Sequence, residues 1–155
     1  MIIRRFVIGE ETALRSVFYS SIHQLTSNEY TQEQQQAWAP LEYDQEQWAI
    51  RIQSINPFVV EIDGCIAAYA DVQATGLIDH FYVAPAFAQK GIGSSLMAHL
   101  HSEASNLRID ELWAKVSLTA EPFFLKHGFQ VETRNAFFTR GVQLFNATMR
   151  KPLPA

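Results

Sequence analysis

The chain has 155 residues, 48% of them hydrophobic, which is enough to fill one substantial core, so we expect residues 1–155 to form a single domain. The formal net charge of −4 argues against a generally basic surface, and neither nucleic acid nor a membrane is an expected partner. No apolar run approaches the length of a membrane span, and the first residues lack the apolar region of a signal peptide, so we expect a cytoplasmic protein.

The first part of the chain predicts a strand followed by three helices. Residues 2–8 are typical of a strand, and apolar residues recur at helical spacing over 10–25. A Thr or Asp followed three residues later by Gln, at 31–34 and at 44–47, has the spacing of a capping box. These two segments therefore predict the starts of two further helices.

A run of strands comes next. Two strands, 58–62 and 65–73, are predicted around Asp63-Gly64, a dipeptide typical of tight hairpins. A third strand, 78–83, leads into a turn that contains two glycines.

The last part of the chain alternates helices and strands. A helix begins at Ile92, a strand covers 111–116, and a shorter helix covers 119–127. Strands at 129–138 and 142–149 are predicted to form a closing hairpin. Strands predominate, with helices between them, so we predict an α/β protein with a mixed sheet.

Residues 82–94 join a strand to a turn that opens a helix. The first turn of a helix has unpaired backbone N–H groups and positive partial charge, so it suits a phosphate. Gly91 and Gly93 allow a tight turn and the close approach of an anion, and Lys90 adds positive charge. The alternative is a loop whose glycines only turn the chain. The phosphate-loop, dinucleotide and Gly-x-Ser-x-Gly motifs are absent from the sequence.

This segment resembles the acetyl-CoA motif of the GCN5-related N-acetyltransferases (the GNAT family). In that motif, a strand with Val-x-Pro runs into Arg/Gln-x-x-Gly-x-Gly/Ala and a helix. Val83, Pro85, Gly91 and Gly93 fall in register with it. Ala88 stands where the family usually has Arg or Gln, which puts one side-chain contact to the pyrophosphate in question but not the backbone cradle.

A second stretch, residues 117–129, resembles the family's Asn-x-x-Ala-x-x-Phe-Tyr-x-Lys-x-Gly-Phe segment. Ser117 stands where the family often has Asn, and Phe124 stands where it often has the Tyr that protonates the departing thiolate. The closing segment 140–149 and the pattern at 30–38 resemble a bacterial subgroup of uncharacterised acetyltransferases. The residues that match the second motif are Ala120, Phe123, Lys126, Gly128 and Phe129.

The resemblance implies the acetyltransferase fold, an α/β fold in which helices flank a mixed, mostly antiparallel central sheet with a splayed pair of parallel strands. The pair would be the strands at 78–83 and 111–116. The implied cosubstrate is acetyl-CoA, whose pantetheine would lie between them and bond to the backbone of Phe81 and Val83. The implied cofactor-binding residues are Phe81, Tyr82, Val83, Ala88, Gln89, Lys90, Gly91, Ile92, Gly93, Ser94, Ser117 and Phe124.

The implied reaction is direct transfer of the acetyl group from acetyl-CoA to the amine of a small molecule, through a tetrahedral intermediate. It needs a base for the amine proton. The candidate catalytic residues are His80 and Asp79, which lie on opposite strand faces, so only one of them can face the acceptor. We favour His80, because an imidazole ordinarily titrates close to physiological pH and suits proton transfer. Further alternatives are Glu61, Glu29 and His23.

The reaction also needs a proton for the departing thiolate. Phe124 has none to give, so Tyr82, Tyr30 or water would supply it. The departures at Leu77, Ala88 and Phe124 keep a second function open, that of a non-catalytic acyl-CoA-binding or sensing protein.

Tyr30 and Trp38 are the candidate substrate-binding residues, because aromatic rings can hold a cationic amine. The alternative is that Trp38, like Trp48, only covers the core. No metal is expected, because Cys65 is the only cysteine and the pair His99 and His101 points apart on a helix. The resemblance also makes a homodimer, formed through the closing hairpin, an expected partner arrangement.

Overall fold

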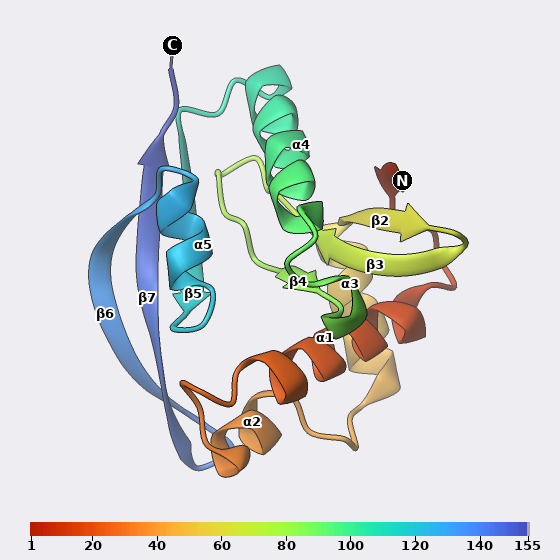
Figure 1. The fold of residues 1–155 in the computed structure, drawn as a ribbon, viewed down its shortest axis with the longest axis vertical. Helices are drawn as coiled ribbons and strands as arrows, with labels where there is room; N and C mark the ends of the chain where they lie inside the picture. Colours follow the sequence, from red (N-terminus) through yellow and green to blue (C-terminus); the bar gives the residue numbers. More distant parts are fainter. Residues whose placement is uncertain (155) are drawn as a thin grey trace.

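The computed structural model describes residues 1–154 and contains two sheets with helices packed around them (Figure 1). In chain order the elements are β1 (Ile2–Arg5), α1 (Glu11–Leu25), α2 (Gln32–Trp38), α3 (Gln45–Ile55), β2 (Phe58–Ile62), β3 (Cys65–Ala70), β4 (Phe81–Val83), a short 3-10 helix η1 (Pro85–Phe87), α4 (Ile92–Asn106), β5 (Glu111–Ser117), α5 (Glu121–Lys126), β6 (Gln130–Thr139) and β7 (Val142–Pro152).

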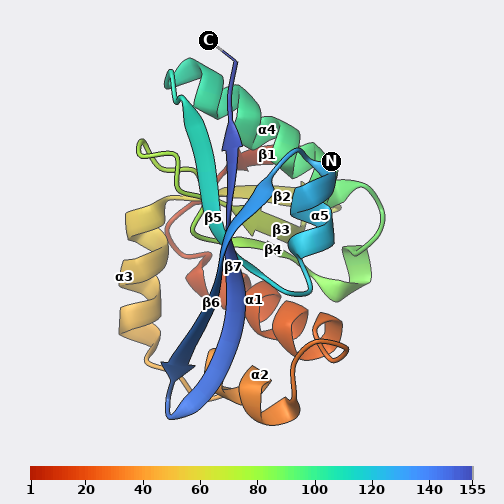
Figure 2. The ribbon, with the colours of Figure 1, turned by 90° about the vertical axis from the view of Figure 1, so that its left-hand side faces the viewer.

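The strands form one sheet in the order β1-β2-β3-β4 and another in the order β5-β7-β6, with every ladder antiparallel. The long strands of the second sheet run steeply across those of the first (Figures 1 and 2). The α/β fold with mostly antiparallel strands and flanking helices is thus confirmed. The predicted splayed pair is not a ladder, because β4 and β5 end different sheets; within residues 1–154 the isolated parallel bridge joins Leu77 and Trp113.

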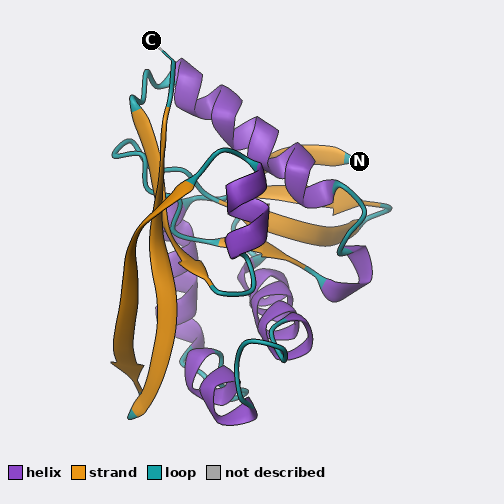
Figure 3. Cartoon of the chain, turned by 60° about the vertical axis from the view of Figure 1, so that its left-hand side comes forward, coloured by secondary structure: helices purple, strands orange, loops and turns teal. Residues whose placement is uncertain are grey.

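Two hydrophobic clusters cover the two faces of the first sheet. Alternation along β3 sends Tyr69 toward α1 and α3, and Ala70 toward α4. The α4 cluster also takes in the second sheet through Leu112 and Met149, which are both fully buried. Figure 3 shows the helices lying on both sides of the short sheet. The two sheets are therefore held together by a shared core.

Both predicted hairpin turns are confirmed. Asp63 and Gly64 have φ of 50° and 78°, and Arg140 and Gly141 have φ of 50° and 77°. Two successive residues with positive φ give the turn whose twist matches the flanking strands, and Gly is the residue that takes this conformation most readily. The second turn carries β6 and β7 toward α2, where the Arg140 guanidinium donates to the Ala37 carbonyl at 2.7 Å.

Three predicted strands are longer than the observed ones. The strand predicted at 65–73 ends at Ala70, and the strand predicted at 78–83 begins only at Phe81. The cause is Asp71, which is fully buried and accepts hydrogen bonds from the backbone N–H groups of Asp79 and His80 at 3.1 and 2.6 Å. The two N–H groups therefore bond to the Asp71 side chain instead of to a backbone carbonyl of a neighbouring strand, and the ladder stops there. The first strand ends at Arg5, since the Glu10 carboxylate accepts from Val7 N and turns the chain.

No helix within residues 1–154 combines the length and the apolar character that crossing a bilayer requires.

Candidate active site

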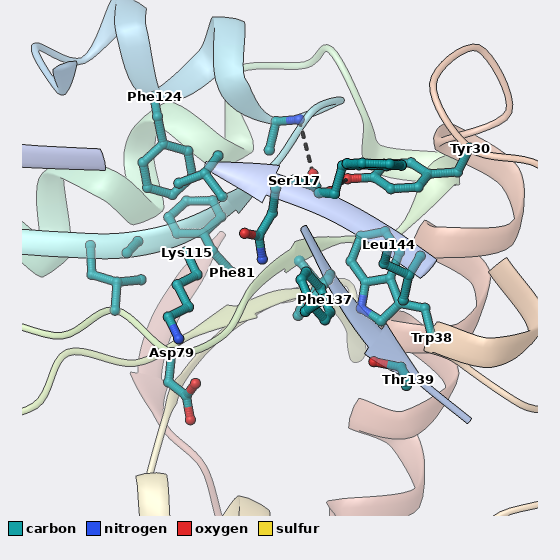
Figure 4. Close-up of a pocket in the computed structure, with 17 residues that line it drawn as sticks. Tyr30, Trp38, Asp79, Phe81, Lys115, Ser117, Phe124, Phe137, Thr139 and Leu144 are labelled. Atoms are coloured by element: carbon teal, nitrogen blue, oxygen red, sulfur yellow. Dashed lines mark hydrogen bonds between the residues drawn. The ribbon is translucent and has the colours of Figure 1, made fainter. Parts of the chain in front are cut away.

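Two adjoining cavities lie between the edge strands β4 and β5. The larger has a volume of about 560 Å³ and the smaller a volume of about 160 Å³. Figure 4 shows residues of the smaller one, with Phe124, Phe81 and Ser117 on one side and Tyr30 and Trp38 on the other. Six residues line both cavities, and we call them the shared wall; a molecule in one cavity would therefore lie next to a molecule in the other. The residues of this shared wall are Trp38, Phe81, Tyr82, Ser117, Ala120 and Phe124.

The larger cavity runs along the open edge of β4. In the β3–β4 ladder, Asp71 N donates to His80 O and Ala84 N donates to Ala67 O. Even-numbered residues therefore face β3, and the backbone groups of Phe81 and Val83 point the other way. Because β4 is the last strand of its sheet, those N–H and C=O groups face the cavity.

The glycine turn closes one end of the larger cavity. Gln89 and Gly91 have φ of 58° and 79°, and α4 begins at Ile92 without a side-chain cap. Its first backbone N–H groups are therefore available to an anion. Five of the predicted residues line the cavity here, whereas Lys90 is exposed at its rim and the side chain of Ile92 is buried in the core; the five are Ala88, Gln89, Gly91, Gly93 and Ser94.

Gly93 has a second role that the sequence did not indicate. A Cβ atom at this position would lie 3.2 and 3.3 Å from two ring carbons of Phe123, so the absent side chain lets the start of α4 contact α5. Phe123 itself lines the larger cavity. The glycine therefore sets the distance between the turn and the opposite wall.

Charged and polar groups of α5 also face the turn. Lys126 lines the larger cavity, and the Ser94 hydroxyl lies 3.1 Å from Nε2 of His127. Burial and the neighbouring Lys126 charge lower the pKa of His127. On the shared wall, the Ser117 hydroxyl accepts a hydrogen bond from Ala120 N at 3.1 Å (Figure 4).

The smaller cavity is lined by aromatic rings from distant parts of the chain. The Tyr30 hydroxyl donates to Phe145 O at 2.5 Å and accepts from Leu118 N at 3.0 Å. The Tyr30 and Trp38 rings lie 5.2 Å apart, and burial raises the pKa of Tyr30. Phe137 and Phe145 of the β6–β7 hairpin complete this aromatic lining. The two predicted substrate-binding residues thus lie side by side in one cavity.

The two candidate bases lie on opposite faces, as alternation requires. Asp79 lines the smaller cavity and pairs with Arg51 at 2.5 Å. His80 lies on the other face, buried, with Nδ1 2.9 Å from the Tyr69 hydroxyl. Burial lowers the pKa of His80 to about 4. Its ring packs against Phe18, so His80 lines neither cavity.

The family profile described as "Acetyltransferase (GNAT) domain" matches residues 26–151, which is most of the chain. The chain belongs to the GNAT acetyltransferase family. As a member, it is an acetyl-CoA-dependent N-acetyltransferase.

Three known proteins are similar to this acetyltransferase. The uncharacterised N-acetyltransferase YafP of Escherichia coli (strain K12) is 29% identical over 143 residues, 88% of this chain and 90% of YafP. A GCN5-related N-acetyltransferase from Rhodopseudomonas palustris, whose structure is also described as an aminotransferase of class II, is 29% identical with a TM-score of 0.93, over 98% of this chain and 95% of that one. The PaiA N-acetyltransferase of Thermoplasma acidophilum, solved with coenzyme A, is 20% identical with a TM-score of 0.76, over 98% of both chains.

Sequence reasoning missed three groups near the cavities of this acetyltransferase. Asp71 fixes the backbone that carries Asp79, and burial raises the pKa of its carboxyl to about 6. The sequence feature that could have indicated Asp71 is an acidic residue directly after an apolar run. Arg51 reaches Asp79 from α3, and Phe137 reaches the smaller cavity from β6. The sequence around Arg51 and around Phe137 gives no sign of these roles, because both contacts join segments far apart in the chain.

Proposed function

We propose that this acetyltransferase moves the acetyl group of acetyl-CoA directly to the amine of a small molecule, through a tetrahedral intermediate. The observation that carries the proposal is the shared wall between a large elongated cavity and a small aromatic one. A donor in the first and an acceptor in the second would meet at Phe81 and Ser117. We further propose that it acts as a single domain in the cytoplasm.

Acetyl-CoA would occupy the larger cavity. Its pyrophosphate would lie on the backbone N–H groups at the start of α4, beside Lys126. Its pantetheine would follow the free edge of β4 and bond to the backbone of Phe81 and Val83, as an added strand does. The similar PaiA structure with coenzyme A supports this placement.

The acceptor amine would enter the smaller cavity. Its aromatic lining suits a small organic amine, since rings bury apolar surface and also attract a cation. Attack on the thioester carbon places negative charge on the carbonyl oxygen. The backbone N–H groups on the open edge of β4 are the donors we assign to that oxygen.

Asp79 is the base that we assign to the amine, acting directly or through water. It lines the smaller cavity, whereas His80 lies on the opposite face against Tyr69 and Phe18. Arg51 fixes the direction of the Asp79 carboxylate. We therefore choose Asp79 over His80.

The test combines binding and turnover. The purified protein is titrated with acetyl-CoA and with CoA in a calorimeter, and thiol release is then followed over a panel of small amines. We expect tight binding and amine-dependent thiol release. Binding with background hydrolysis alone would favour an acyl-CoA sensor, and absence of binding would contradict the assignment of the larger cavity.

Gly93→Val should weaken acetyl-CoA binding about tenfold, or about 1.4 kcal/mol. The added side chain meets the Phe123 ring and pushes the start of α4 away from the opposite wall. Calorimetry measures the affinity. Ser95→Val, in the same helical turn but lining neither cavity, is the matched control. An affinity within twofold of the wild type would show that the contact does not shape the cavity.

A further inference from the structure

The smaller cavity has a positive charge that no neighbouring carboxylate balances. Of the residues that line this cavity, Asp79 and Lys115 carry charge. The Asp79 carboxylate is already paired with Arg51 from α3. Within residues 1–154, the ion pairs of the structure do not include Lys115. Arg51, Asp79 and Lys115 therefore leave one positive charge over at the cavity.

Lys115 has a second donor beside it on the neighbouring strand. In the β5–β7 ladder, Lys115 lies opposite Thr148. Two residues further along the same face of β5, Ser117 lies opposite Asn146. Lys115 and Asn146 are thus diagonal neighbours, a spacing that long side chains can span. Both line the smaller cavity, so an ammonium group and a side-chain amide meet in one part of it.

The amide of Asn146 can donate to a ligand. Its oxygen Oδ1 accepts a hydrogen bond from Asn135 Nδ2 at 2.9 Å. This contact fixes the direction of the amide and leaves the N–H groups of Asn146 as donors. An ammonium group and an amide N–H group together suit an anionic group with two oxygens, such as a carboxylate.

The charged and the aromatic parts of the smaller cavity lie apart. In Figure 4, Lys115 and Asp79 lie on the side of the cavity away from Tyr30 and Trp38. An acceptor whose amine reaches Asp79 would place the groups next to that amine beside Lys115, and its apolar body against the rings. An α-amino acid has this arrangement, because its amine and its carboxylate are attached to one carbon.

We propose that the acceptor is an α-amino acid with an apolar side chain, and that Lys115, with Asn146 beside it, binds its carboxylate. This inference rests on the proposed function and names the class of amine. The carboxylate would balance the charge of Lys115 and form a charge-assisted hydrogen bond with it. Lys115 would touch the acceptor away from the reacting atoms, so it should affect KM more than kcat.

The test uses matched pairs of amines at saturating acetyl-CoA. Phenylalanine is compared with phenethylamine, tryptophan with tryptamine, and leucine with isoamylamine, so that each pair differs by one carboxylate. The same comparison is made for every other amine of the panel that releases thiol. We expect the wild type to use the amino acid with a kcat/KM about tenfold higher, as a hydrogen bond between charged groups allows.

Variants of Lys115 show which group recognises the carboxylate. Lys115 is exposed, so its replacement should not prevent folding. Lys115→Met should reduce the preference to about twofold or less and leave kcat/KM for the decarboxylated amines within about threefold of the wild type. Lys115→Arg keeps the charge and should keep the preference. Lys151→Met is the matched control, because Lys151 lines neither cavity.

The outcomes separate this inference from the proposed function. A wild type that uses both members of every accepted pair within about threefold would overturn the inference and leave the proposed function standing. A preference that persists in Lys115→Met would also overturn it, since another group would then bind the carboxylate. Absence of thiol release with every amine would instead refute the proposed function, and this inference with it.

Discussion

Asp79→Asn should lower the rate of acetyl transfer about 100-fold and leave acetyl-CoA binding unchanged. The amide keeps the shape of the carboxylate but cannot accept the amine proton, and the loss of a positioned base typically costs ~10²–10⁴-fold. Asp79 lines the smaller cavity and not the larger one, so the donor site should be unaffected. Steady-state thiol release and calorimetry measure the two quantities.

Two comparisons make this result specific. Asp63→Asn applies the same chemical change at the β2–β3 turn, away from both cavities, and should keep the wild-type rate. His80→Gln tests the rival base; its rate, corrected for the folded fraction, should stay within a few-fold of the wild type. A full rate in Asp79→Asn together with a large loss in His80→Gln would reverse the assignment.

Asp71→Ala should destabilise the protein by about 2–4 kcal/mol. The Asp71 carboxylate accepts from Asp79 N, from His80 N and from Gln73 Nε2 at 2.7 Å. Removing it leaves buried donors without an acceptor, at about 1–3 kcal/mol each before relaxation. Denaturant unfolding measures the loss. Because the same bonds hold the backbone of Asp79, acetyl transfer should fall as well.

Asp71→Asn should keep most of this stability, since the amide oxygen can still accept the two backbone bonds. It should also change the pH dependence of stability. The Asp71 pKa of about 6 lies above the unfolded value of about 3.9, so the folded state binds the proton more tightly. Asp71 therefore adds stability as the pH falls from about 6 to 4, and this contribution is lost as the pH rises.

The pH effect must be measured as a difference, because His80 acts in the opposite direction. Its lowered pKa means that stability is lost as the pH falls from about 6.5 toward 4. Subtracting Asp71→Asn from the wild type removes the His80 contribution. The wild type should gain about 1–3 kcal/mol relative to the variant between pH 7 and pH 4. A constant difference would show that Asp71 does not titrate in this range.

The parts that the sequence predicted are those with local causes. The two hairpins follow from residues that accept positive φ, and the start of α4 follows from the turn at Gly91. The turn that lines the larger cavity was predicted for the same reason. Alternation along an extended segment also predicts that Asp79 and His80 lie on opposite faces.

The parts that could not be predicted depend on contacts between distant segments. Which face of β4 meets the acceptor cavity is decided by the packing of α1 and α3 on the other face, where His80 lies among Phe18 and Trp48. β3 ends early because the Asp71 side chain accepts the hydrogen bond from His80 N. The strand propensity of the residues does not predict such a bond. The second role of Gly93 depends on the position of Phe123.

The β6–β7 hairpin supplies much of the lining of the smaller cavity, and within residues 1–154 it supplies none of the larger cavity. Substitutions on this hairpin can therefore alter which amine is accepted without changing the residues that line the acetyl-CoA cavity. Phe137 and Phe145 are partly exposed, so replacing either with another residue should cost little stability. A gene duplicate could in this way acquire a new acceptor through a few changes in a single exposed hairpin.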